Sequence, residues 1–237
     1  MLRTSMKMAA AALAAGAVLT ACGPVKMGAA AVMPSQRISE STLAAEVSNL
    51  NQGYLRYKGK ISLQFPVSQM PQQVLGWLVR FRVRDQLAAA RGIKLTPAQV
   101  QAAYAMIKSQ AQASAPGTPV NLAELAVANG LPPDLLTALA SYQAIESVLV
   151  NRLDGGILPK SSAAQQALGT QFARAECLTA KGLDIKINPQ FGRLDYSEYS
   201  IVPAPSTLSA AGPSLSPSPA ASPAASPSAA PQLTPAC

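Results

Sequence analysis

The side chains that most often perform catalysis are scarce in this chain, which has no histidine, three cysteines and eleven acidic residues. It therefore lacks the commonest general base, the usual activator of Ser and Cys nucleophiles and the commonest transition-metal ligand. Cys177 has no second cysteine at zinc-ligand spacing, and there is no glycine-rich phosphate loop. The closest carboxylates, Asp195 and Glu198, are more simply explained as a solvated pair in a loop than as an acid/base couple. We therefore expect no enzyme, no catalytic residue, no metal site and no cofactor.

Cys22 has the most informative surroundings of any residue in the chain. Arg3 and Lys7 precede an apolar run at residues 8–18, which is the layout of a secretory signal peptide and is too short for a membrane-spanning helix. Residues 19–23, Leu-Thr-Ala-Cys-Gly, resemble the lipobox of bacterial lipoproteins. The resemblance implies that residues 1–21 are removed and that the Cys22 thiol carries a diacylglycerol, with a further acyl chain such as palmitate. The alternative is an ordinary secreted protein with a cysteine near its cleavage site.

The lipid would place the protein at the cell membrane, on the extracytoplasmic face. Residues 22–28 form a short anchor linker with a reach of about 20 Å. Removal of Arg3 and Lys7 lowers the formal charge from +8 to +6, and this excess is spread without a run of like charges. The pattern does not indicate nucleic-acid binding, whereas basic side chains near a lipid anchor favour an anionic membrane surface.

Cys177 and Cys237 remain after Cys22 is assigned to the lipid. An oxidising compartment permits a disulfide between them, but the bridge would close a loop of about 60 residues at an entropic cost. A buried, reduced Cys177 is the simpler interpretation. The sequence leaves both open.

Composition divides the mature chain into two parts. Residues 204–237 are almost entirely Ala, Ser and Pro and carry no charge, which predicts a disordered tail. Such a tail could be a wall-spanning spacer, a substrate for O-glycosylation or only a solubilising segment. Residues 29–203 form the one candidate domain.

Helix signals fill most of residues 29–203. Ser39 can cap a first helix, and Thr96-Pro97 with Gln99 forms a capping box with proline at the first helical position. Further helices are expected over residues 71–91, from Asn121 to about residue 129, after Pro132-Pro133, and over residues 162–181. The prediction is a bundle of about six helices.

The two ends of this domain break the helical pattern. Residues 29–33 are a short apolar run, and residues 183–188 alternate between apolar and polar, as in a half-buried strand. A single strand leaves its backbone groups unsatisfied. We therefore expect the two segments to pair, so that a small β-sheet closes a mainly α bundle.

This layout resembles the N-terminal domain of the SurA/PrsA-type extracytoplasmic chaperones. The carrying segments are residues 29–39, residues 84–100 and the returning segment 185–192, and the likeness extends from residue 29 to about residue 195. The resemblance implies a domain that holds unfolded exported proteins through apolar surface. Many members also carry a parvulin prolyl isomerase domain before the returning strand, and this chain has no room for one there.

One non-helical stretch is a candidate contact for a client polypeptide. Ile61, Leu63, Phe65 and Val67 alternate with other residues, as in a strand edge that could bind an extended chain. The simpler interpretation is a linker packed along the bundle, because Pro66 weakens a continuous ladder.

Three arginines and one tryptophan on the second expected helix each have a structural and a functional interpretation. Arg80, Arg84 and Arg91 could face acidic clients or lipid headgroups, although a solvated face explains them more simply. Trp77 is expected in the core.

Taken together, the sequence predicts a membrane-anchored extracytoplasmic chaperone-like lipoprotein that binds unfolded or exported polypeptides without catalysis. The alternatives are a structural or adaptor lipoprotein with one envelope partner and, less simply, a peptidyl-prolyl isomerase.

Overall fold

The computed structural model describes residues 28–34, 36–153, 161–196 and 200–203. This part of the chain is mainly helical with small antiparallel sheets, which confirms the predicted fold class. Its α-helices are α1 (Glu40–Tyr57), α2 (Met70–Ala90), α3 (Pro97–Ser114), α4 (Leu122–Ala128), α5 (Leu136–Leu153) and α6 (Ser162–Gly182). Two single 3₁₀ turns, η1 (Val67–Gln69) and η2 (Pro133–Leu135), precede α2 and α5.

The helices begin where the capping residues predict. The Ser39 side chain accepts a hydrogen bond from the Thr42 backbone N–H, at 3.0 Å. Thr96 and Gln99 form the predicted reciprocal capping box, and Asn121 caps α4 through the backbone N–H of Ala123. These caps satisfy N–H groups that have no partner within the helix, so local sequence fixes the starts before packing acts.

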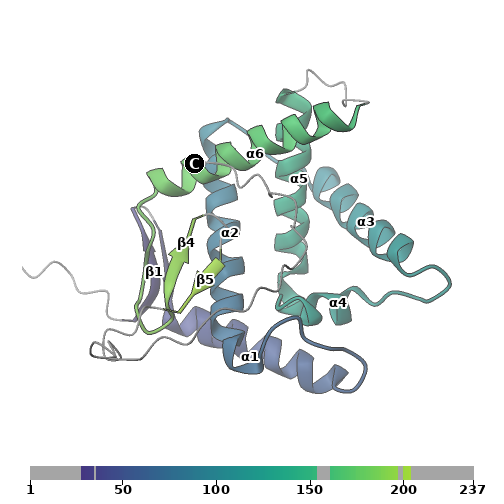
Figure 1. Cartoon of the computed structure of the whole chain (residues 1–237), viewed down its shortest axis with the longest axis vertical. Helices are drawn as coiled ribbons and strands as arrows, with labels where there is room; N and C mark the ends of the chain where they lie inside the picture. The colour runs from purple at the N-terminus through teal and green to yellow at the C-terminus, as the bar shows by residue number, and fades with distance from the viewer. Residues whose placement is uncertain (1–27, 35, 154–160, 197–199, 204–237) are drawn as a thin grey trace, which may run out of the picture.

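Helix α2 is the centre of the arrangement. It packs against α1, α5 and α6, and Figure 1 shows α1 crossing one end of α2, α6 crossing the other end and α5 running beside it. Helix α3 lies on the outer side of α5 and packs mainly against that helix. The main core cluster therefore gathers around α2, with Leu43 and Leu50 from α1 and Val74, Leu75 and Val79 from α2 all at most 2 % exposed.

The two ends of the domain meet in one sheet, as predicted. Strand β1 (Ala29–Met33) lies between β2 (Gln36–Ser39) and β3 (Lys186–Ile187), and both neighbours run antiparallel to it. Val32 pairs with Lys186, and the Asn188 backbone N–H donates to the Ala30 carbonyl at 2.9 Å. The amide of Asn188 also donates to Glu40 at the start of α1, at 3.0 Å. This side chain joins the returning end of the domain to its first strand and first helix.

A second small sheet was not predicted. Strand β4 (Arg193–Asp195) pairs antiparallel with β5 (Ser200–Val202), so the expectation that Asp195 lies in a loop was wrong. Gly192 enters β4 with φ +119°, and a Cβ atom there would overlap the Val202 carbonyl. Glycine permits both the backbone angle and the close approach of β5. Glu198 and Ser35, which belongs to the turn after Met33, lie outside the described residues.

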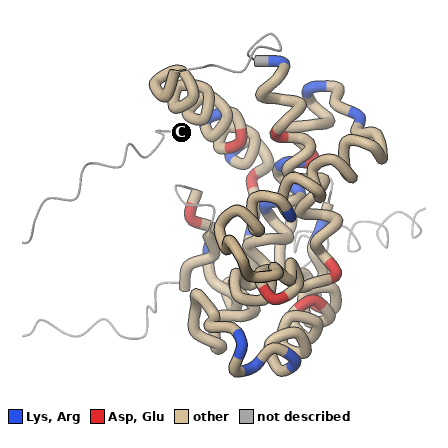
Figure 2. The backbone as a smooth tube through the Cα atoms, turned by 90° about the vertical axis from the view of Figure 1, so that its right-hand side faces the viewer, with Lys and Arg blue, Asp and Glu red and all other residues tan. Residues whose placement is uncertain are grey.

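Charged side chains are distributed over the whole described part of the chain. Figure 2 shows Lys and Arg at the top, in the middle and at the bottom of the view, with Asp and Glu among them. Within these residues, no helix is both long enough and apolar enough to cross a membrane. The leader 1–21, Cys22 with most of its linker, and the tail 204–237 lie outside the described residues.

Candidate functional site

An apolar pocket opens between four helices of the bundle. Its volume is about 210 Å³. Helix α2 contributes Trp77, α3 contributes Ile107, and α5 contributes Leu136 and Leu139. The rest of the lining comes from α4 and the residues that follow it: Leu122, Leu125, Ala126, Asn129 and Leu131.

Aromatic contacts hold the inner wall of this pocket. The Trp77 indole N–H donates to the Asn129 carbonyl at 3.3 Å, which ties α2 to the end of α4. The Trp77 ring lies 5.8 Å from Phe81, and Phe81 makes an edge contact with Tyr142 of α5 at the same distance. Trp77 is therefore half-buried in the pocket wall rather than fully in the core as expected, because its indole needs a hydrogen-bond partner and finds one at the rim.

The outer wall of the pocket is weakly held. Ala103 is the one buried residue of α3, so Ile107 is carried by a helix that buries little side-chain surface although it packs along α5. On α4, Leu125 is 44 % exposed at the rim although it lines the pocket. The outer wall of the pocket therefore exposes more apolar surface than the inner wall.

The chemistry of the pocket is burial. Its lining is apolar except for Asn129 and the indole N–H, and that N–H is already bonded. Ligand pockets for whole small molecules usually have about 300–1,000 Å³, so this one is suited to a single large apolar side chain. In the described residues, no group of three or more Cys, Asp or Glu is placed to hold a metal ion.

A closed charged cluster lies on the same two helices, α2 and α5, where they meet α6. Arg84 is 2 % exposed, and its guanidinium donates to Glu176 at 2.6 Å, to Glu146 at 2.9 Å and to the Tyr142 carbonyl at 3.1 Å. The same group lies 3.4 Å from the centre of the Tyr142 ring and 4.5 Å from that of Phe172. We call these five residues the Arg84 cluster. The expectation that Arg84 belongs to a solvated face was wrong.

The electrostatics of the Arg84 cluster favour the charged guanidinium. Burial acts to lower the pKa of Arg84, but the hydrogen bonds and charge interactions with Glu176, Tyr142 and Glu146 together outweigh burial and raise the pKa above its ordinary value. Burial raises the pKa of the Tyr142 hydroxyl to about 12, so this group stays neutral. Because the donors and acceptors of this cluster bind one another, it holds three helices together and has little capacity to bind a ligand.

The other two arginines of the predicted flank differ from Arg84. Arg80 lies over the Trp77 ring, with its guanidinium carbon 5.1 Å from the ring centre. Arg91 is exposed, and its carbonyl accepts a hydrogen bond from Arg152. The three side chains therefore do not form one common surface.

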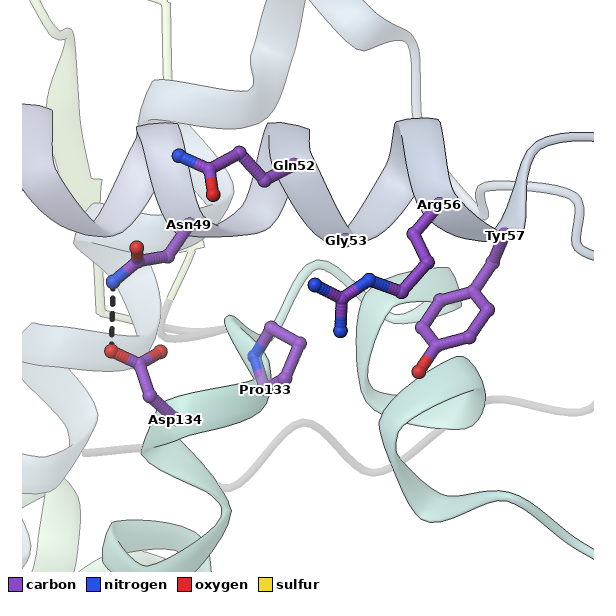
Figure 3. Close-up of a pocket in the computed structure, with 7 residues that line it drawn as sticks. All are labelled: Asn49, Gln52, Gly53, Arg56, Tyr57, Pro133 and Asp134. Carbon is purple, nitrogen blue, oxygen red and sulfur yellow. Dashed lines mark hydrogen bonds between the residues drawn. The ribbon is translucent and has the colours of Figure 1, made fainter.

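A second pocket, of about 180 Å³, lies between α1 and η2 and is polar (Figure 3). The Asn49 amide donates to Asp134 at 2.7 Å at one end, and Arg56 and Tyr57 line the other end. Gly53 lies between them, and a Cβ atom there would be 2.7 Å from the Val127 side chain of α4. The missing side chain allows α1 to approach α4 closely, so this pocket marks a tight helix contact.

Most of the predicted client contacts lie in a linker that packs against the bundle. Ile61, Leu63 and Phe65 are half-buried against the main core, and the Gln64 backbone N–H donates to the Ala128 carbonyl at 3.0 Å. Val67 is 51 % exposed at the start of η1. The alternation thus reflects one side of a linker facing the bundle, and Val67 is the member of the set most open to a partner.

Sequence reasoning missed the apolar pocket. It located the helix after Asn121 and the long helix after Pro132-Pro133, but it gave no reason to treat Leu125 as different from any other leucine. The available signal was the short length of α4. A helix of seven residues is not stable by itself, so its apolar side chains must pack against neighbouring helices.

Comparisons with known proteins do not place the chain in a family. No family model matches it, and no curated protein or solved structure matches it significantly.

Proposed function

We propose that the mature chain is a lipid-anchored, extracytoplasmic, non-catalytic chaperone-like protein that binds unfolded or exported polypeptides. The observation that carries the proposal is the apolar pocket between α2, α3, α4 and α5. Unfolded chains expose large apolar side chains that folded proteins bury, and a pocket with an apolar lining accepts such a side chain with little selection for sequence.

The size of the pocket sets the expected strength of binding. Burial of one large apolar side chain contributes about 1.5–3 kcal/mol, whereas a millimolar complex needs about 4 kcal/mol. A single contact is therefore weak and quickly reversed, as a protein that holds and releases clients requires. Additional contacts with the exposed Leu125 rim would add to it.

Attachment to the membrane would compensate for weak affinity. The proposed lipid on Cys22 would keep the pocket close to the surface where exported chains appear, which raises their effective concentration. Cys22 itself lies outside the described residues, so this part of the proposal depends on the sequence pattern alone.

Aggregation of an unfolded model protein tests the proposal. The chain from residue 22 onward, made without lipid as Cys22→Ser, is expected to suppress aggregation at an equimolar ratio. Leu125→Ser places a hydroxyl at the pocket rim and is expected to reduce suppression at least twofold, and adding Ile107→Ser is expected to reduce it further.

Leu178→Ser is the matched control, because Leu178 of α6 is 53 % exposed and does not line the pocket. This variant is expected to suppress aggregation as well as the parent. Equal loss in Leu125→Ser and Leu178→Ser would assign binding to general apolar exposure, and no suppression by the parent would refute the chaperone proposal.

A second candidate, an adaptor lipoprotein with one partner, is favoured by the defined size of the pocket, which suits a single anchoring side chain. Competition separates the two candidates. Several unrelated unfolded proteins should displace one another from a chaperone, whereas an adaptor should bind none of them. A prolyl isomerisation assay of the same preparation tests the remaining alternative, a peptidyl-prolyl isomerase.

A further inference from the structure

Cys177 differs from the simpler expectation for it, because it is disulfide-bonded rather than reduced. Its side chain is 3 % exposed on α6, and its sulfur lies 3.8 Å from the carbonyl oxygen of Tyr196, the residue after β4. The sequence has two other cysteines, Cys22 and Cys237, and both lie outside the described residues. One of these two is the partner of Cys177.

We propose that Cys177 is joined to Cys237 by a disulfide bond. This choice rests in part on the proposed function, because a Cys22 sulfur that carries a diacylglycerol is a thioether and cannot form a disulfide. Two features of the fold support the same choice independently.

The direction of the sheet places the start of the domain away from Cys177. Strand β3 follows α6 and runs antiparallel to β1, with Lys186 opposite Val32 and Asn188 bonded to Ala30. Following the chain back from Asn188 toward α6 therefore leads to the Met33 end of β1, whereas Gly28 lies at the opposite end of that strand. Cys22 has only about 20 Å of linker with which to return.

The last described strand begins close to Cys177. Strand β5 pairs with β4, so Ser200 lies opposite Asp195, next to the residue whose carbonyl is near the Cys177 sulfur. From Val202 the chain has 35 residues in which to reach that sulfur. A free Pro-rich tail of this length could extend about 100 Å, so closing the loop meets no limit of reach.

The bond forms by oxidation of two thiols. The Cys177 and Cys237 thiols together lose two protons and two electrons as the S–S bond forms. The electrons and protons pass to a protein disulfide of the thiol–disulfide oxidoreductase class, which is reduced to two thiols through a mixed disulfide. An extracytoplasmic location supplies such an oxidant.

Peptide mapping of the membrane-extracted protein tests the pairing. The protein is alkylated without reduction and digested with trypsin, which cuts after Arg174, Lys181 and Arg193. The expected product is residues 175–181 joined to residues 194–237, two hydrogens lighter than the separate peptides, and it should separate after reduction. Alkylated Cys177 in the unreduced sample, or a disulfide-linked dimer, would overturn the proposal.

Two variants keep the proposal separate from the proposed function. Cys22→Ser should retain the linked peptide although it cannot be lipidated, and Cys237→Ser should make Cys177 alkylatable on unfolding while the circular dichroism stays helical. A link from Cys177 to Cys22 would overturn both the pairing and the lipid anchor. Loss of aggregation suppression alone, with the linked peptide intact, would overturn only the chaperone proposal.

Discussion

The Arg84 cluster and the apolar pocket occupy the same pair of helices, α2 and α5, and their construction is opposite. In the Arg84 cluster each charged group is matched by a partner, and three helices are fixed to one another. In the pocket the lining is apolar, one wall is a helix with little buried surface, and Leu125 is left exposed. The difference shows how one bundle can combine a rigid joint with an open apolar pocket, since charge demands a defined geometry and apolar burial does not.

The largest expected effect is the loss of Arg84. Arg84→Ala leaves Glu176, which is 14 % exposed, without its guanidinium, and removal of one member of a buried ion pair destabilises by about 3–5 kcal/mol. Urea unfolding of the parent and the variant measures this change. Arg82→Ala is the control, because Arg82 is exposed on the same helix and its loss should change stability by no more than about 0.5 kcal/mol.

A double variant sharpens this test of the rigid region. Arg84→Met combined with Glu176→Met removes both members of the Arg84–Glu176 ion pair. This double variant is expected to recover part of the stability lost in Arg84→Ala. If Arg84→Ala unfolds no more easily than Arg82→Ala, the Arg84 cluster does not fix the helices, and the contrast with the pocket disappears.

An intermediate effect is expected at Gly53, where α1 meets α4 behind the pocket. Gly53→Ala would place its Cβ 2.7 Å from the Val127 side chain, and such overpacking destabilises by about 1–3 kcal/mol. Because α4 carries Leu122 and Leu125, the same change is expected to weaken aggregation suppression.

Gly76→Ala is the matched control for Gly53→Ala. Its nearest neighbour would be Ile201 at 4.0 Å, so a methyl group fits there. Alanine favours a helix interior over glycine by about 1 kcal/mol, and Gly76→Ala is expected to unfold at equal or higher urea concentration than the parent. Destabilisation by both variants to the same degree would show that the contact between α1 and α4 is not especially tight.

The smallest effect concerns Glu46 of α1, beside the polar pocket. Burial, and then the neighbouring Asp134 carboxylate, raise the pKa of Glu46 above its ordinary value of 4.5. The folded state therefore holds the Glu46 proton more tightly than the unfolded state, and the stability from this group is present at low pH and is lost as pH rises through the raised pKa.

Glu46→Gln removes this titration. The variant is expected to be slightly more stable than the parent at pH 7, and the difference should vanish well below pH 4.5, where Glu46 is protonated in both the folded and the unfolded parent. Urea unfolding at both pH values measures it. A variant that is less stable than the parent at pH 7 would contradict the assignment of Glu46 as an unfavourable charge.

The parts of the fold that were predicted from the sequence are those set by local residues. Ser39, Thr96 and Asn121 begin helices because their side chains satisfy N–H groups a few residues away, and such signals are visible without any structure. The pairing of β1 with β3 was also predicted, because two apolar segments at the domain ends had no other partner. This prediction did not use local sequence signals, but the requirement that the backbone N–H and C=O groups of each strand find hydrogen-bond partners.

The parts that were not predicted depend on contacts between distant helices. Arg84 reads as a surface residue, since nothing near it in sequence shows that Glu146 and Glu176 approach it from α5 and α6. The pocket was missed for the same reason: Trp77 and Leu125 are 48 positions apart, and only packing brings them to one cavity. The β4–β5 pair depends on a close approach at Gly192, which a lone glycine in the sequence does not reveal.

The position of β1 has a consequence for the order in which the domain folds. Its partner residues arrive late, because Ala29 and Asn188 are 159 positions apart, so the first strand to emerge must wait for nearly the whole domain before its second edge is covered. A chain that crosses a membrane from its first residue onward would therefore complete its sheet as the last step of folding, after the helices have formed between them.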